Sequence, residues 1–166
     1  QNVRPDTYYN LTIDGNATHQ IGSSSINVLG NLVVNQNGST VFDTRDLNIT
    51  VSGTADINGT LDIGTGTFDA NGTFNASGTP VGDVTFTGAG VLELGSTVTS
   101  LGNYTGSNST ILFNGSSAQT INAGSGFTVD NLTVNNASGV TLNTDVTINS
   151  TLTLTCLLYT SDAADE

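Results

Sequence analysis

Short runs in which apolar and polar residues alternate recur along most of the chain. In the middle of the sequence, an apolar side chain stands at every second position in Thr54-Ala-Asp-Ile57, Thr60-Leu-Asp-Ile63, Thr67-Phe-Asp-Ala70 and Thr73-Phe-Asn-Ala76. This is the period of a β-strand with one buried face. Gly-Thr recurs at positions 53, 59, 66, 72 and 78, and Asn-Gly pairs begin at 37, 58, 71 and 114. These pairs predict sharp corners at which glycine supplies a positive φ.

A longer repeat of about 20 residues is superimposed on these short strands. Asn10-Leu-Thr-Ile13 matches Asn131-Leu-Thr-Val134, Leu32 follows Leu11 by 21 residues, and Leu152 follows Leu132 by 20. Three short strands and their turns fill one such interval, which is one coil of a solenoid. The sequence therefore predicts an all-β parallel β-helix of seven or eight coils, a rod roughly 35 Å long. The alternative is a β-sandwich of hairpins, whose turn signals would come every 8 to 12 residues or so.

In a parallel β-helix, the inward side chains of each coil pack against those of the coils above and below. The alternation predicts that the inward residues include Leu11, Ile13, Leu32, Val34, Val84, Phe86, Leu92, Leu94, Ile111, Phe113, Leu132, Val134, Val140, Leu142, Val146, Ile148 and Leu152. The outward positions between them are predicted to be Thr12, Thr85, Thr133, Thr141, Thr147 and Thr153.

The composition supports this fold class. The chain of 166 residues has 28 Thr, 16 Ser, 20 Asn and 20 Gly, and it lacks Lys, Met and Trp. Strong helix formers are scarce, which argues against a helical protein. Because 36% of the residues are hydrophobic, we expect an ordered chain despite the net charge of -12.

The charge excludes several classes of partner. Phosphate backbones and anionic lipid surfaces are bound by clustered Lys and Arg, and this chain has only Arg4 and Arg45. We therefore expect no nucleic-acid binding, and no apolar run approaches the roughly 20 residues needed for membrane insertion. The sequence begins at Gln1, with neither an initiator Met nor a recognisable signal peptide. We therefore expect a fragment of a longer chain. Its predicted partner is the continuation of its own polypeptide, and unprotected strand edges predict end-to-end self-association of the fragment.

The last eleven residues break the pattern. In Cys156-Leu-Leu-Tyr-Thr-Ser-Asp-Ala-Ala-Asp-Glu166, Gly and Asn disappear, the alternation stops, and the only Cys of the chain occurs. This segment resembles the in-frame translation of a sequencing adapter. We therefore interpret 1–155 as the β-solenoid repeat domain and 156–166 as a non-native tail.

Two stretches resemble known secreted proteins. The stretch Phe113-Asn-Gly-Ser-Ser-Ala-Gln-Thr-Ile121, with Asn131–Leu142 and Asp145–Leu154 after it, resembles the repeat of large secreted bacterial β-strand-repeat proteins. Gly88-Ala-Gly-Val-Leu-Glu-Leu94 with Asn103-Tyr-Thr-Gly106 is similar to the repeat of autotransporter passenger domains, of the filamentous-haemagglutinin-like kind. The resemblance implies a right-handed β-helix on a cell surface or in the extracellular space, acting as a stalk or adhesin, with cell-surface or extracellular glycans as possible ligands.

The sequence offers little material for catalysis, so we predict no catalytic, cofactor-binding or metal-binding residues. His19 is the only imidazole and is interpreted as a solvent-facing turn residue. Asp56, Asp62 and Asp69 are six or seven residues apart, which places them on different faces of a coil. Asp43 and Asp46 flank Arg45 and predict a solvated charge cluster.

The predicted function is thus a non-catalytic structural or adhesive module, with two alternatives. Paired carboxylates would suit a polysaccharide-active enzyme on the same scaffold. An ice-binding solenoid would need the T-x-T motif at the same place on every coil, and the motifs beginning at 65, 85, 97 and 151 are unevenly spaced. Thirteen N-x-S/T sequons occur, and an Asn at a corner followed by a strand Thr accounts for much of that number.

Overall fold

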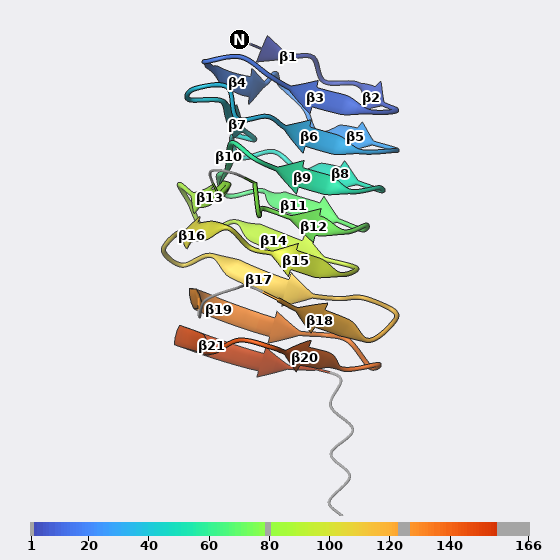
Figure 1. Ribbon diagram of the computed structural model, residues 1–166, viewed down its shortest axis with the longest axis vertical. Coiled ribbons are helices and arrows are strands. Elements are labelled where there is room, and N and C mark those ends of the chain that lie inside the picture. Colours follow the sequence, from blue (N-terminus) through green and yellow to red (C-terminus); the bar gives the residue numbers. More distant parts are fainter. Residues whose placement is uncertain (1, 79–80, 123–126, 156–166) are drawn as a thin grey trace, which may run out of the picture.

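The chain winds through three parallel β-sheets in which the strands of one coil stack on those of the next (Figure 1). The computed structural model describes residues 2–78, 81–122 and 127–155. Within these ranges every regular element is a strand. The all-β prediction is confirmed, and the 156–166 tail lies outside the described residues.

Each sheet takes about every third strand of the chain. Sheet A contains β1 (Asn2–Val3), β4 (Thr18–Ile21), β7 (Val41–Asp43), β10 (Thr60–Ile63), β13 (Asp83–Phe86) and β16 (Asn103–Thr105). Sheet B contains β2 (Thr7–Tyr8), β5 (Ile26–Val28), β8 (Ile49–Val51), β11 (Thr67–Ala70), β14 (Val91–Leu94), β17 (Thr110–Phe113), β19 (Phe127–Val134) and β21 (Val146–Leu154). Sheet C contains β3 (Leu11–Ile13), β6 (Leu32–Val34), β9 (Ala55–Ile57), β12 (Phe74–Asn75), β15 (Val98–Ser100), β18 (Gln119–Ile121) and β20 (Val140–Leu142).

Successive coils pair in parallel, which confirms the solenoid. Leu11 is the register partner of Leu32, and Leu132 is the partner of Leu152, as predicted. Paired residues lie from 18 positions apart, as in Asn2↔Gln20, to 25 apart, at Asn75↔Ser100 after a register shift. The β-sandwich alternative is wrong, because the strands on either side of the Asn58-Gly59 corner, β9 and β10, belong to different sheets.

The interior consists of columns of apolar side chains, one side chain per coil. One column of sheet B runs through Ile26, Ile49, Phe68, Leu92, Ile111, Leu132 and Leu152. The corresponding column of sheet C runs through Leu11, Leu32, Ala55, Phe74, Val98, Ile121 and Leu142. Phe68 and Phe74 meet edge to face across the core, with ring centroids 6.3 Å apart. Each coil therefore depends on its neighbours for burial.

The corner glycines have a different role from the predicted one. Of the four Asn-Gly pairs, only Asn37-Gly38 has its glycine at positive φ. At Gly72 a Cβ would lie 2.2 Å from the carbonyl oxygen of Gly53, in the preceding coil. The corners therefore require glycine mainly because the backbones of stacked coils approach too closely for a side chain.

Asparagines at the corners tie one coil to the next. The Asn10 Oδ1 accepts a hydrogen bond from the Asn31 N–H at 2.8 Å, and the Asn31 Oδ1 accepts one from the Thr54 N–H at 2.9 Å. The Asn48 Oδ1 accepts from the Thr67 N–H in the same way. These bonds satisfy backbone donors at the turns, which gives the Asn of several sequons a structural role.

The predicted inward residues are inward, with one deviation in the last coil. Those from Leu11 to Leu132 are buried, whereas Leu142 and Leu152 are 46% and 50% exposed. Val134, Val140, Val146 and Ile148 are half-buried. The side chains point as predicted, but no described coil follows to cover them.

Candidate functional site

The outward columns place the acidic residues, because an outward side chain lies beside the register partner from the coils above and below. Asp56, Asp62 and Asp69 lie on β9, β10 and β11, which belong to sheets C, A and B. The prediction that these three carboxylates occupy different faces is confirmed. Acidic neighbours arise instead between coils.

The first acidic pair is Asp43 and Asp62 on sheet A. They are register partners in β7 and β10, whose backbones lie about 4.8 Å apart as in any parallel sheet. The Gln20 side-chain amide donates a 2.7 Å hydrogen bond to the Asp43 carboxylate from the preceding coil. The Asp62 Oδ1 is buried and lacks a hydrogen-bond partner among the described residues. Burial, and then the charge of Asp43, raise the pKa of Asp62.

The second acidic pair is Asp69 and Glu93 on sheet B. They are register partners in β11 and β14. The Asn71 amide donates to Asp69 at 3.0 Å, and the Asn114 amide donates to Glu93 at 3.0 Å. Burial and the neighbouring Asp69 charge raise the pKa of Glu93. Each pair thus contains one carboxyl group that holds its proton to higher pH than usual.

Sequence analysis did not identify these pairs. Asp43 and Asp62 are 19 residues apart, and Asp69 and Glu93 are 24 apart. The usable signal was two outward acidic residues separated by one coil. Because coil length varies along the chain, this signal could not be distinguished from a chance spacing.

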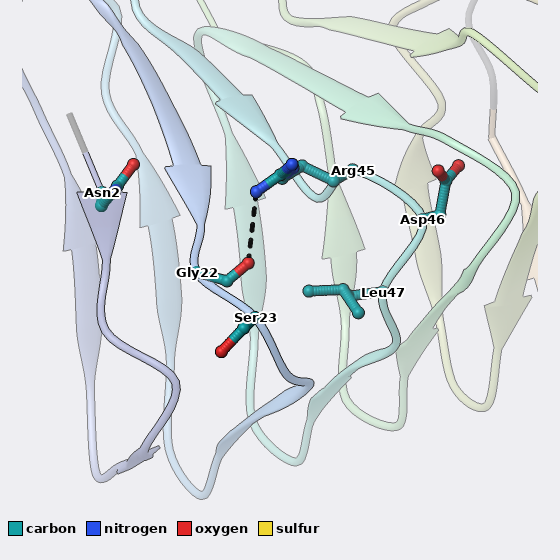
Figure 2. Close-up of a pocket in the computed structure, with 6 residues that line it drawn as sticks. All are labelled: Asn2, Gly22, Ser23, Arg45, Asp46 and Leu47. Carbon is teal, nitrogen blue, oxygen red and sulfur yellow. Dashed lines mark hydrogen bonds between the residues drawn. The ribbon is translucent and has the colours of Figure 1, made fainter.

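An open hollow of about 540 Å³ lies where the chain turns from sheet A to sheet B near the N-terminal end (Figure 2). Its lining residues are Asn2, Gly22, Ser23, Arg45, Asp46 and Leu47. The Arg45 guanidinium points toward Gly22 and donates a 3.3 Å hydrogen bond to its carbonyl oxygen, as Figure 2 shows.

The carboxylates beside Arg45 bind backbone and hydroxyl groups. The Asp43 Oδ1 accepts from the Arg45 N–H at 2.7 Å, and the Asp46 Oδ1 accepts from the Thr65 N–H and hydroxyl, both at 2.9 Å. These Thr65 hydrogen bonds lower the pKa of Asp46. Arg45 and Asp46 are exposed as predicted, but the predicted cluster is built from turn contacts, and Arg45 itself sits at a φ of 55°.

A second shallow hollow, of about 400 Å³, lies on the outer face of sheet C. It is lined by Asn31, Leu32, Val33, Thr54, Asp56, Thr73, Asn75 and Thr99. Asp56 accepts hydrogen bonds from the Asn75 amide at 3.0 Å and the Asn58 amide at 3.2 Å. One outward column here reads Thr12, Val33, Asp56 and Asn75, so this part of sheet C lacks the repeated T-x-T array of an ice-binding face.

The interpretation of His19 as a solvent-facing turn residue is wrong. His19 lies in β4, is 7% exposed, and occupies the inward position whose register partner is Phe42. The same column continues through Leu61, Val84 and Tyr104. The His19 Nε2 is buried without a hydrogen-bond partner among the described residues. The alternation in Thr18-His-Gln-Ile21 indicated the buried position correctly. His19 is two residues from buried Ile21 and therefore lies on the same face of the strand.

Asn136 is a sequon residue that the fold uses internally. It is 2% exposed, and its amide donates to the Ser117 carbonyl at 2.8 Å and to the Gln119 Oε1 at 2.9 Å. Gln119 in turn donates to the carbonyls of Leu94 and Ser96. Glycosylation of Asn136 would therefore require opening this buried network.

The described residues contain no group of three or more His, Cys, Asp or Glu arranged to hold a metal ion. In the same ranges there is no helix with the length and apolar character to cross a bilayer. Comparison with protein-family models, curated proteins and solved structures finds no match to this chain.

Proposed function

We propose that residues 1–155 are a non-catalytic structural module, a stalk or adhesin segment of a large secreted or cell-surface protein. The observation that carries the proposal is the stack of parallel coils, in which sheets B and C and their core columns continue from the first described coil to the last. Each added coil extends such a rod by about 4.8 Å without changing its cross-section. A module of this kind acts as a rigid spacer and needs no catalytic groups.

The outer surface supports an extracellular setting with neutral partners. Outward positions are mostly Thr, Asn and Asp, and the net charge of -12 repels anionic polymers. The hollow on sheet C offers amide, hydroxyl and carboxylate groups side by side, which suits hydrogen bonding to the hydroxyls of a neutral glycan. Neutral cell-surface or extracellular glycans are therefore the proposed ligands if the module is adhesive.

The stacked carboxylates favour one second candidate, a polysaccharide-active enzyme. Retaining glycosidases place two carboxyl groups about 5–5.5 Å apart, one of them with a raised pKa. Asp43 with Asp62, and Asp69 with Glu93, offer this combination on neighbouring strands. Neither pair lines either of the two polar hollows described above, which is why we favour the structural role.

Catalysis and adhesion can be tested on one panel of neutral polysaccharides. Reducing ends released by the full chain are compared with those released by Asp62→Asn, Glu93→Gln and the matched exposed control Asp145→Asn. We expect no release above the blank for any of them. Release that is lost in Asp62→Asn or Glu93→Gln but kept in Asp145→Asn would establish the enzyme.

The same polysaccharides, immobilised on surfaces, test whether the structural module is an adhesin or a stalk. Beads that carry the chain are washed over each surface. Retention that is reduced by Asp56→Ala identifies an adhesin using the sheet C hollow, and absence of retention identifies a stalk.

A further inference from the structure

The Asn-Gly pairs of the chain are chemically alike, but the fold surrounds them differently. In an Asn-Gly sequence, the backbone nitrogen of the glycine can attack the side-chain amide carbon of the asparagine, because glycine has no Cβ to obstruct the approach. Such an attack requires a glycine N–H that is free of other bonds and a peptide that has room to turn. The pairs are Asn37-Gly38, Asn58-Gly59, Asn71-Gly72 and Asn114-Gly115.

Two of these pairs have the glycine nitrogen engaged in a hydrogen bond. The Gly59 N–H donates to the Val34 carbonyl oxygen at 2.9 Å. The Gly115 N–H donates to the Gln119 Oε1 at 3.0 Å. Both glycines are buried. Attack at either position would therefore first require local opening of the corner.

The Asn71-Gly72 pair is held by packing against the preceding coil. A Cβ at Gly72 would lie 2.2 Å from the Gly53 carbonyl oxygen, and the Asn71 N–H donates to the Val51 carbonyl oxygen at 2.9 Å. Turning the peptide between residues 71 and 72 would drive it into the backbone of that coil.

Asn37-Gly38 is the open pair. It lies on the turn between β6 and β7, and both residues are exposed. The Asn37 N–H donates to the Thr40 hydroxyl at 3.3 Å, whereas the Gly38 N–H has no hydrogen-bond partner among the described residues. A Cβ at Gly38 would meet the Asn16 side chain at 2.8 Å. Since that side chain is exposed, it can move aside more readily than the backbone carbonyl that faces Gly72.

We propose that Asn37 is a site of spontaneous deamidation in the folded chain. The Gly38 nitrogen gives up its proton and bonds to the Asn37 Cγ, and the Nδ2 group takes up a proton and leaves as ammonia. Water then adds to one of the two carbonyl carbons of the cyclic imide and opens the ring. The product is aspartate or isoaspartate at position 37, and the net reaction consumes water and releases ammonia.

The modification would alter a contact between two coils. The Asn37 side-chain amide donates a hydrogen bond to the Asp14 carboxylate, on the turn before β4. The Asn35 amide donates to the same carboxylate at 3.3 Å. Deamidation replaces the Asn37 donor by a second carboxylate, so that two like charges face each other. We therefore expect the reaction to loosen the contact between these two turns.

Peptide mapping by mass spectrometry after incubation at mildly alkaline pH tests the site. Because Lys is absent and Arg4 precedes Pro5, trypsin cleaves only after Arg45, and the peptide 1–45 contains Asn37-Gly38 as its one Asn-Gly pair. Fragmentation of the remaining peptide resolves the other pairs. In the native chain, Asn37 should deamidate at least about tenfold faster than Asn58, Asn71 and Asn114.

The same chain in guanidinium chloride is the matched control, and all four pairs should react there at similar rates. A native rate at Asn37 that does not exceed the other three would overturn the proposal. An excess at Asn37 that persists in guanidinium chloride would also overturn it, because the selectivity would then not come from the fold.

Amide exchange tests the effect on the two coils separately. The Ser39 N–H donates across the coils to the Asn16 Oδ1 at 2.9 Å and reports on this contact. Its exchange should be faster in the aged chain and in Asn37→Asp than in the fresh chain. Aged Asn37→Gln should match the fresh chain, because glutamine would have to close a larger ring. Unchanged exchange in Asn37→Asp would overturn the proposed loosening, whatever the deamidation rates are.

Discussion

The two ends of the solenoid differ in how well their core side chains are covered. At the N-terminal end, Leu11 and Ile13 belong to the first coil, yet they are only 9% and 3% exposed. At the C-terminal end, Leu142, which ends the column of Leu11, is 46% exposed, and Leu152 and Leu154 of sheet B are 50% and 47% exposed. Both sets occupy inward positions of the same repeat. Their exposure therefore depends on how each end coil is built, because the repeat itself is the same.

The first coil is narrow and folds over the core. Val3 and Tyr8 pack against the core from strands of two residues each, and the Tyr8 hydroxyl donates a 2.8 Å hydrogen bond to the Arg4 carbonyl. Pro5 lies close to Gly22 of the second coil, where a Cβ would meet its ring at 3.1 Å. The short segment between β1 and β2 thereby acts as a cap.

The last coil is wide and leaves the core open. β20 and β21 keep the full strand length, and β21 is longer than any other strand. The two end coils thus differ in strand length, since β1 and β2 have two residues each and β21 has nine, and in how much of the core they leave exposed. At the N-terminal end, Val3 and Tyr8 are the side chains of β1 and β2 that pack against the core.

The largest expected effect comes from one substitution made at each end. Leu11→Ala should lower the free energy of unfolding by about 2–4 kcal/mol, because it opens a cavity under a closed cap. Leu152→Ala should cost about 1 kcal/mol or less, because half of that side chain is already in water. Urea denaturation followed by circular dichroism measures both. Equal losses would mean that the two ends are equally covered in solution.

A second substitution tests the polar residue beneath the N-terminal cap. His19→Phe replaces a buried imidazole, whose Nε2 lacks a partner, by the residue that occupies the same column position at Phe42. An unsatisfied buried polar group costs about 1–3 kcal/mol, so the variant should be stabilised by about 1 kcal/mol. Phe42→His is the matched control and should destabilise the chain. A destabilised His19→Phe variant would show that the imidazole has a partner in solution.

The architecture was predictable because it depends on patterns that each coil repeats. Alternation in Thr60-Leu-Asp-Ile63 identified a strand, and the spacing of Leu11 and Leu32 identified the coil. Both signals are local or nearly periodic. The right-handed sense implied by the family resemblance stays a prediction.

The candidate sites were less predictable because they depend on register. Asp62 lies beside Asp43 only because that coil is 19 residues long, and the spacing between register partners elsewhere reaches 25. The interpretation of His19 as a turn residue did not use its place in the alternation, which puts it on the inward face of β4. The exposure of Leu152 depended on whether a further coil covers it, which no local pattern encodes.

A third prediction concerns the tail that follows the open end. Deletion of residues 156–166 should change the free energy of unfolding by no more than about 0.5 kcal/mol, as for ordinary surface changes. We expect so small a change because the tail sequence does not follow the pattern of the repeat. Thermal denaturation of the full and shortened chains makes the measurement. A loss of several kcal/mol would mean that Leu157 and Leu158 cover the C-terminal core, and the contrast between the two ends would disappear.

The smallest expected effect is a local acid response of the turn around Asp14, at the N-terminal end. Hydrogen bonds from the Asn37 and Asn35 amides lower the pKa of Asp14, on the turn before β4. The folded chain therefore binds this proton more weakly than the unfolded chain does. The resulting stabilisation is complete above the ordinary carboxyl pKa and is lost as the pH falls through the lowered value.

Asp62 and Glu93 have raised pKa values, so their contribution runs the other way: it is lost as the pH rises. A global melting temperature would mix these opposing effects, and local amide exchange separates them. After correction for intrinsic rates, the amides of Gly15 and Ser39 should exchange faster at about pH 3 than at about pH 6, whereas those of Thr147 and Thr153 should not change. Asp14→Asn should remove the acid response and Asp145→Asn should keep it. An acid response shared by β21 would show that the loosening is not specific to the capped end.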